Sequence, residues 1–170
     1  MRCIPFRNGA FSSVVCIHAI EHIPDPTPLL TESRRILAHS GTAVFVTPNR
    51  LTFGRPDEVI DPYHFVEYDA QALQGLCQQH FSSASLFGLF GSPRYMELFH
   101  EERERLARLL RYDPLRLRRF VPRRLRQIFY DGLLTRFRLD SATEEISIAD
   151  FELRSGPIDD ALDLFAVCRR

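Results

Sequence analysis

The sequence predicts an α/β fold in which parallel strands alternate with helices. Two short apolar runs rich in β-branched residues, Ser13–His18 and Thr42–Thr47, flank a segment with helical periodicity. This pattern is typical of two buried parallel strands joined by a crossover helix. Each run ends in polar side chains. Because ligands of such sheets bind at the carboxyl ends of the strands, we expect the functional site there.

Length and composition indicate one globular unit with a proper core. The chain has 170 residues, of which 45% are hydrophobic and 11% aromatic, values typical of folded domains. The 22 basic residues are all Arg and balance 22 acidic ones, so the net charge of zero selects no partner. Twelve of the Arg lie between Arg103 and Arg138. They favour either an acidic substrate or, more simply, a solvated helix face.

Four cysteines lie far apart and form no C-x-x-C pair, which argues against a zinc or redox motif. No apolar run approaches the roughly 18 residues of a membrane span, and the N-terminus lacks the apolar region of a signal peptide. We therefore expect a cytoplasmic protein with reduced thiols and no membrane span.

The first half of the chain predicts a loop, a strand, a helix and a second strand. Residues 1–10 contain the turn-like Asn8-Gly9. The strand Ser13–His18 is apolar on both faces, which favours a central position in the sheet. Asp25 is the expected N-cap of the helix and Pro26 its first residue. The residues expected to face inward are Leu29, Leu30, Ser33, Ile36 and Leu37. A turn at Ser40-Gly41 separates this helix from the second strand, which stops at Pro48.

The second half predicts a loop over 49–65, a helix capped by Asp69 and running to Gln79, and a strand over Ser82–Gly88. The residues of this helix expected to face inward are Leu73, Leu76 and Cys77. Residues 93–139 have a helical pattern broken by two prolines and are expected to form an inserted Arg-rich subdomain or lid. Strands are expected at Ile146–Leu153 and at Ala161–Cys168.

Several short motifs, all in one register, resemble the second half of class I S-adenosylmethionine-dependent methyltransferases of the type 11/12 group. The matching pieces are Ile4-Pro5-Phe6, Phe11, Val14-Val15-Cys16, Glu21 to Pro26, Arg35-Ile36-Leu37, Gly41-Thr42 and Thr47 to Arg50. The resemblance implies a partial Rossmann-like sheet with the family's strands in the order 4-5-7-6, strand 7 being antiparallel, and a helical insertion before the last strand. The methyltransferase portion would then comprise residues 1–92 and 140–170, and the insertion residues 93–139.

The family's strands 1 to 3 have no counterpart in this sequence. Missing with them are the Gly-rich loop that wraps the cofactor and the acid that holds its ribose, and Gly88-Leu89-Phe90-Gly91 has the wrong spacing to replace the loop. The resemblance thus implies the substrate-side half of a methyltransferase, with an incomplete S-adenosylmethionine site. It also implies an open edge on the first strand. Such an edge is expected to pair with another copy or a partner chain, or to be shielded by the first ten residues.

The resemblance also implies roles for particular residues. Glu21, His22 and His64 are the expected catalytic groups, and Ile17, His18 and Ala19 the expected cofactor contacts. The expected substrate contacts are Thr47, Pro48, Asn49 and Tyr63. The implied substrate is a small or acidic molecule, and nucleic acid remains among the acidic partners without being the expected one.

Carboxylate and imidazole groups in this combination also suit a divalent metal. The layout is similar to that of small-RNA 2′-O-methyltransferases, in which an E-x-x-E-H element and a later His bind the ion, although His18 stands where the first acid would be. The expected interpretation is a family signature without a metal, with His18, Glu21, His22 and His64 kept as candidate ligands. Two alternative functions therefore remain. One is a metal-dependent RNA 2′-O-methyltransferase, and the other is a non-catalytic binding or assembly module.

Overall fold

A computed structural model describes residues 3–53, 63–110 and 146–170 of the chain. These residues form two compact units. The first contains the described residues up to 53, residues 64–90 and residues 153–170, and the second contains residue 63, residues 91–110 and residues 146–152.

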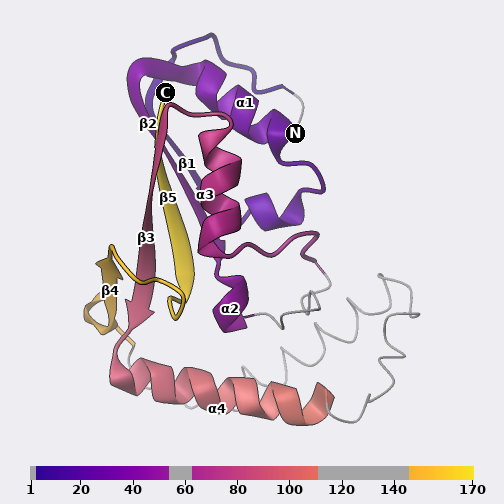
Figure 1. Cartoon of the computed structure of the whole chain (residues 1–170), viewed down its shortest axis with the longest axis vertical. Coiled ribbons are helices and arrows are strands. Elements are labelled where there is room, and N and C mark those ends of the chain that lie inside the picture. The colour runs from indigo at the N-terminus through magenta and orange to yellow at the C-terminus, as the bar shows by residue number, and fades with distance from the viewer. Residues whose placement is uncertain (1–2, 54–62, 111–145) are drawn as a thin grey trace. The chain divides into compact units, whose positions relative to one another are not determined.

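The sheet has five strands in the order β1-β2-β5-β3-β4. Their bounds are Phe11–Ile17 for β1, Leu37–Pro48 for β2, Ser83–Gly91 for β3, Phe151–Arg154 for β4 and Asp163–Arg169 for β5. β1 pairs with β2 in parallel, and β5 lies between β2 and β3, antiparallel to both. The predicted 4-5-7-6 order with an antiparallel last strand is thereby confirmed (Figure 1).

Two helices cover one face of this sheet, α1 over Thr27–Ile36 and α3 over Ala70–Gln78 (Figure 1). Their buried side chains are those that the helical periodicity predicts, including Leu30 on α1 and Leu73 on α3, both fully buried. They pack in one cluster with Phe45 of β2 and Leu164 of β5. The core of the first unit therefore lies between one sheet face and these helices.

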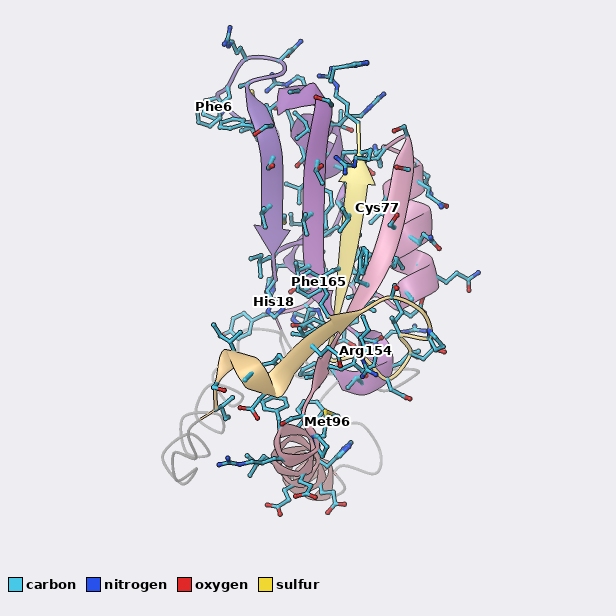
Figure 2. All side chains as sticks on the ribbon, turned by 90° about the vertical axis from the view of Figure 1, so that its left-hand side faces the viewer. Phe6, His18, Cys77, Met96, Arg154 and Phe165 are labelled. Carbon is cyan, nitrogen blue, oxygen red and sulfur yellow. The ribbon has the colours of Figure 1, made fainter. Side chains whose placement is uncertain are left out.

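Within the described residues of the first unit, the opposite face of β1, β2, β5 and β3 carries no helix (Figure 2). On β1 this face exposes Val15 and Ile17, which are 60% and 63% accessible. In the register of the sheet, Val46 lies beside Ile17 and Phe165 lies beside Val46, so apolar side chains continue across this face. The expectation that β1 is central, because it is apolar on both faces, is wrong: among the described strands β1 lies at the edge.

Residues 3–10 form no strand beside β1. Phe6 packs on Phe11 at the start of β1 with ring centroids 4.8 Å apart. The segment is also held against α1, where Glu32 accepts from the Ile4 amide at 2.8 Å and the Arg35 guanidinium donates to the carbonyls of Ile4 and Phe6 at 2.9 and 2.8 Å. The Arg35 guanidinium and the Ile4 amide lower the pKa of Glu32 to about 2. The shielding of the β1 edge by the first ten residues stays a prediction.

The second strand begins earlier than expected. Residues 37–41 belong to β2, not to a turn at Ser40-Gly41. The register explains why: Phe11 pairs with Leu37, but Ser13 pairs with Thr42, so two steps along β1 correspond to five along β2. The extra residues are accommodated as an irregularity inside the ladder.

The predicted helix starts are nearly right. Asp69 caps α3 by accepting from the Ala72 amide at 2.9 Å. Asp25 accepts from the Thr27 amide at 3.0 Å, but the residue before α1 is Pro26, one position later than expected. A short helix α2, Arg50–Phe53, follows β2.

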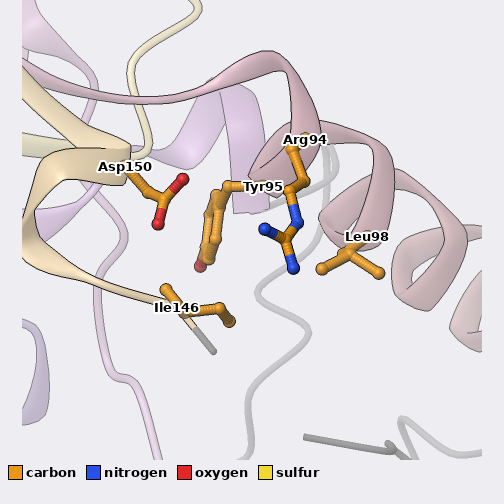
Figure 3. A pocket seen from close by; sticks show the side chains of 5 residues that line it. All are labelled: Arg94, Tyr95, Leu98, Ile146 and Asp150. Atoms are coloured by element: carbon orange, nitrogen blue, oxygen red, sulfur yellow. The ribbon is translucent and has the colours of Figure 1, made fainter. Parts of the chain in front are cut away.

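The second unit contains the helix α4, Pro93–Leu110, and a 3₁₀ turn over Ile148–Asp150. Asp150 accepts from the Ser147 amide and from the Ser92 hydroxyl, both at 2.9 Å. It borders a shallow depression with Arg94 and Tyr95 (Figure 3). Ile146–Leu153 is thus a strand only in its last part, and most of the predicted insertion, 111–139, lies outside the described residues. No helix in the described ranges is both long and apolar enough to cross a membrane.

Gly88 permits the close approach of β3 to the turn before β5. A Cβ there would lie 2.6 Å from the Ala161 Cβ and 2.9 Å from the Ile158 Cγ2, both in the core. We expect Gly88→Ala to lower the free energy of unfolding by about 1–3 kcal/mol in urea titrations. In the matched control Gly75→Ala, the new methyl group on α3 meets nothing within 4 Å. It should raise stability by about 0.5–1 kcal/mol, and equal effects of the two changes would contradict this packing.

Candidate functional site

The candidate site lies where the parallel strands β1 and β2 end. The His18 amide donates to the Val46 carbonyl at 2.9 Å, which extends the ladder one residue beyond β1. The chain then turns through a 3₁₀ helix, Ile20–His22, that carries Glu21 and His22. His18 appears beside these strand ends in Figure 2.

Glu21 is the most deeply buried charged group of the site. Its side chain is 1% accessible, and its Oε2 accepts a hydrogen bond from the Thr47 hydroxyl at 3.0 Å. This bond joins the segment after β1 to the end of β2. The other oxygen, Oε1, is buried without a hydrogen-bond partner and lies 4.0 Å from the His22 Nε2.

The backbone of Glu21 brings a third segment to the site. Its carbonyl accepts from the amides of Phe65 and Val66 at 2.8 and 3.3 Å, and Asn49 forms an isolated parallel bridge with Tyr68. As a result the rings of His22 and His64 lie with centroids 5.0 Å apart. The structure thus brings Glu21, His22 and His64 together.

Glu67 orients His64. The His64 Nδ1 lies 3.3 Å from the Glu67 Oε1, and both side chains are largely buried. The sequence analysis did not single out Glu67. The available signal was its spacing of three residues from His64, which lets a short turn fold the carboxylate back onto the ring.

His18 makes a separate pair. Its Nε2 lies 3.3 Å from the Asp163 carboxylate at the start of β5. Its backbone adopts a positive φ of 44°, in the left-handed region that non-glycine residues seldom occupy. The sequence analysis missed Asp163 as its partner, because the pairing depends on β5 lying next to β2.

The predicted substrate contacts Thr47 and Asn49 are fully buried among the described residues. Thr47 donates to Glu21. The Asn49 Nδ2 donates to the carbonyls of Asp159 and Ala161 at 2.7 and 2.9 Å, and its Oδ1 accepts from the Leu51 amide at 3.1 Å. Both residues support the site from within, and their role toward a substrate stays a prediction.

The remaining predicted residues lie at or just after the ends of the parallel strands, except for Tyr63. Ile17 is exposed at the end of β1, Ala19 is half-buried before the 3₁₀ helix, and Pro48 is half-buried at the end of β2. Tyr63 belongs to the second unit. Their roles toward cofactor and substrate stay predictions.

Burial raises the pKa of two groups close to Glu21. Burial, and secondly the negative charge of Glu21, raises the pKa of Tyr68 to about 12 and also raises the pKa of the Cys16 thiol. Both groups therefore stay protonated and neutral at pH 7.

The pair of His18 and Asp163 should make stability depend on pH. The hydrogen bond to Asp163 raises the pKa of His18 despite partial burial, so the pair stabilises the fold fully below the ordinary value near 6.5 and loses this contribution as pH rises through the raised pKa. We expect His18→Asn, which tolerates the left-handed backbone but does not titrate, to cost about 0.5 kcal/mol more at pH 5.5 than at pH 8.5, after allowance for solvent screening. Urea titrations at the two pH values measure this difference. A cost independent of pH would contradict the pairing.

The amide of Asn49 should be needed for stability. Asn49→Leu leaves the Asp159 carbonyl without its donor and the Leu51 amide without its acceptor, so we expect it to lower the free energy of unfolding by about 2–3 kcal/mol. Thr52 donates to the same Ala161 carbonyl at 2.7 Å, and Thr52→Val should cost only about 1 kcal/mol. Chemical denaturation measures both changes, and a loss under 0.5 kcal/mol for Asn49→Leu would show that its hydrogen bonds are dispensable.

Comparison with known proteins agrees with this architecture. A structure of an S-adenosylmethionine-dependent methyltransferase from Thermotoga maritima superposes with a TM-score of 0.57 at 13% identity, covering 99% of this chain and 60% of that one. This likeness bears on the fold alone, and it confirms the predicted Rossmann-like architecture.

Relatives of known family are found by sequence. A protein of Mycobacterium tuberculosis described as a probable S-adenosylmethionine-dependent methyltransferase is 35% identical over 98 residues, which are 56% of this chain and 35% of that protein. A similarly described protein of Mycolicibacterium smegmatis is 32% identical over 98 residues and is covered to 38%. The match thus spans little more than a third of these relatives. Over residues 4–92, more than half of the chain, the sequence matches the family model described as a methyltransferase domain, and the chain therefore belongs to this methyltransferase family.

Proposed function

We propose that this chain acts as the acceptor-side portion of an S-adenosylmethionine-dependent methyltransferase. The observation that carries the proposal is the convergence of Glu21, His22 and His64 at the carboxyl ends of β1 and β2, where sheets of this kind bind their ligands. The family match and the relatives' descriptions support the reaction class.

The residues after β1 fit one wall of a cofactor site. Ile17 is 63% accessible, and the left-handed backbone of His18 turns the chain away from the strand directly after it. No Gly-rich phosphate or nucleoside loop occurs in the described residues. The solved relative is covered to only 60%, which supports the view that other elements form the opposite wall.

S-adenosylmethionine supplies an electrophilic methyl group on a sulfonium sulfur. The protein's part is to align an acceptor and to remove its proton when the acceptor is a hydroxyl. His22, whose side chain is 42% exposed beside the buried Glu21 carboxylate, is the group placed to accept that proton. Thr47 and Glu67 hold Glu21 and His64 in position.

The substrate class and the compartment belong to the same proposal. A small or acidic acceptor remains the expectation from sequence, and the Arg-rich segment on which the binding-module alternative depends lies mostly outside the described residues. Four free thiols, two of them buried, support a reducing compartment such as the cytoplasm.

Titration of the ¹⁵N-labelled chain with S-adenosylhomocysteine tests the cofactor wall. We expect shifts of the Ile17, His18 and Ala19 amides at millimolar concentrations, with an affinity about 100-fold weaker than a micromolar complete site, because only one wall is present. Adenosine at the same concentration is the ligand control, and Ile17→Arg should abolish the shifts. Unchanged amides at 17–19, or shifts confined to other segments, would overturn the assignment of this wall.

A further inference from the structure

The three side chains at the strand ends form a geometry suited to a cation. One ligand atom from each of Glu21, His22 and His64 lies within 4.8 Å of the other two. Bonds of about 2.0–2.2 Å place two tetrahedral ligands about 3.4 Å apart, so closing the widest pair around an ion needs a shift of about 1.4 Å. The His22 side chain is 42% exposed and can make that movement by rotation.

The buried carboxylate supplies an independent observation. Glu21 is 1% accessible, and although its Oε2 accepts from Thr47, its Oε1 has no hydrogen-bond partner. A half-satisfied buried carboxylate costs several kcal/mol unless another group compensates it. The His22 Nε2 lies 4.0 Å from this oxygen, which is too far for a hydrogen bond but leaves room for an atom that binds both.

The second imidazole is oriented as metal-binding histidines are. The His64 Nδ1 lies 3.3 Å from the Glu67 carboxylate, so the tautomer that donates to Glu67 keeps the lone pair on Nε2. An outer carboxylate that fixes the ring in this way accompanies most histidine ligands. The neighbouring His18 is instead paired with Asp163 at 3.3 Å and stands outside the cluster.

We propose that Glu21, His22 and His64 bind one divalent first-row transition-metal ion, with Glu67 as the outer partner of His64. Two imidazoles and one carboxylate suit Mn²⁺, Fe²⁺, Co²⁺ or Zn²⁺ better than Mg²⁺, which prefers oxygen ligands throughout. Three protein ligands leave coordination positions open. Binding itself does not require the cofactor, whereas the use of the ion to lower the pKa of an acceptor hydroxyl rests on the proposed function. With an ion bound, His22 would be a ligand, and the lowered pKa of the hydroxyl would take the place of proton transfer to His22.

Titration of the chelator-treated full chain with Co²⁺, followed by calorimetry and by visible absorption, tests the site without any cofactor. We expect one equivalent to bind. Glu21→Gln, which keeps an acceptor for Thr47, and His64→Ala should each weaken binding at least tenfold. Glu67→Gln should weaken it about tenfold, because only the outer partner is lost. Circular dichroism identifies any variant that fails to fold, and the isosteric Glu21→Gln then decides the test.

The matched control is His39→Ala, because His39 is exposed at the other end of β2. It should bind Co²⁺ as tightly as the unmodified chain. The proposal is overturned if no equivalent of Co²⁺ binds, if Glu21→Gln binds it unchanged, or if His39→Ala loses it. Mn²⁺ should also broaden the amide resonances of residues 21–22 and 64–67. Failure here leaves the shifts at residues 17–19 with S-adenosylhomocysteine unaffected, so the two proposals fail separately.

Discussion

The site depends on one buried carboxylate, that of Glu21. Its side chain receives a hydrogen bond from Thr47 at the end of β2, while its backbone carbonyl receives the amides of Phe65 and Val66 from the segment before α3. One residue thus fastens three segments that are distant in sequence. Placing an acid in the core is costly in itself, and the hydrogen bond from Thr47 offsets part of that cost.

The sheet that positions this carboxylate is completed by the end of the chain. β5 lies between β2 and β3 and is antiparallel to both, and Thr47 at the end of β2 pairs with Leu164 of β5. Asn49 forms a second link between the end of β2 and the last strand, because its buried side-chain amide donates to the carbonyls of Asp159 and Ala161 in the turn leading to β5. The end of β2 at the site and the turn before β5 are therefore held together by the same hydrogen bonds.

The open side of the sheet has a different consequence. β1 is the edge of the described sheet, and the face with Val15 and Ile17 carries no helix there. An edge that exposes unpaired backbone and apolar side chains is a template for further pairing. This agrees with a family in which the matched relatives are much longer than the match, and the expectation of self-association or of a partner chain at this edge stays a prediction.

The sequence by itself determined the elements and their order. Apolar periodicity identified α1 and α3 with their inward residues, β-branched runs identified β1 and β2, a shorter apolar run identified β5, and the motif register identified the family. The ends of the parallel strands brought Glu21 and His22 together with the end of β2, and the resemblance added His64. Only the tertiary structure decided that Thr47 and Asn49 are buried supports, that Glu67 orients His64, and that Asp163 holds His18. The physical reason is that a local pattern specifies which residues follow a strand, whereas burial and hydrogen-bond partners depend on which strand becomes its neighbour and which turn packs beneath it.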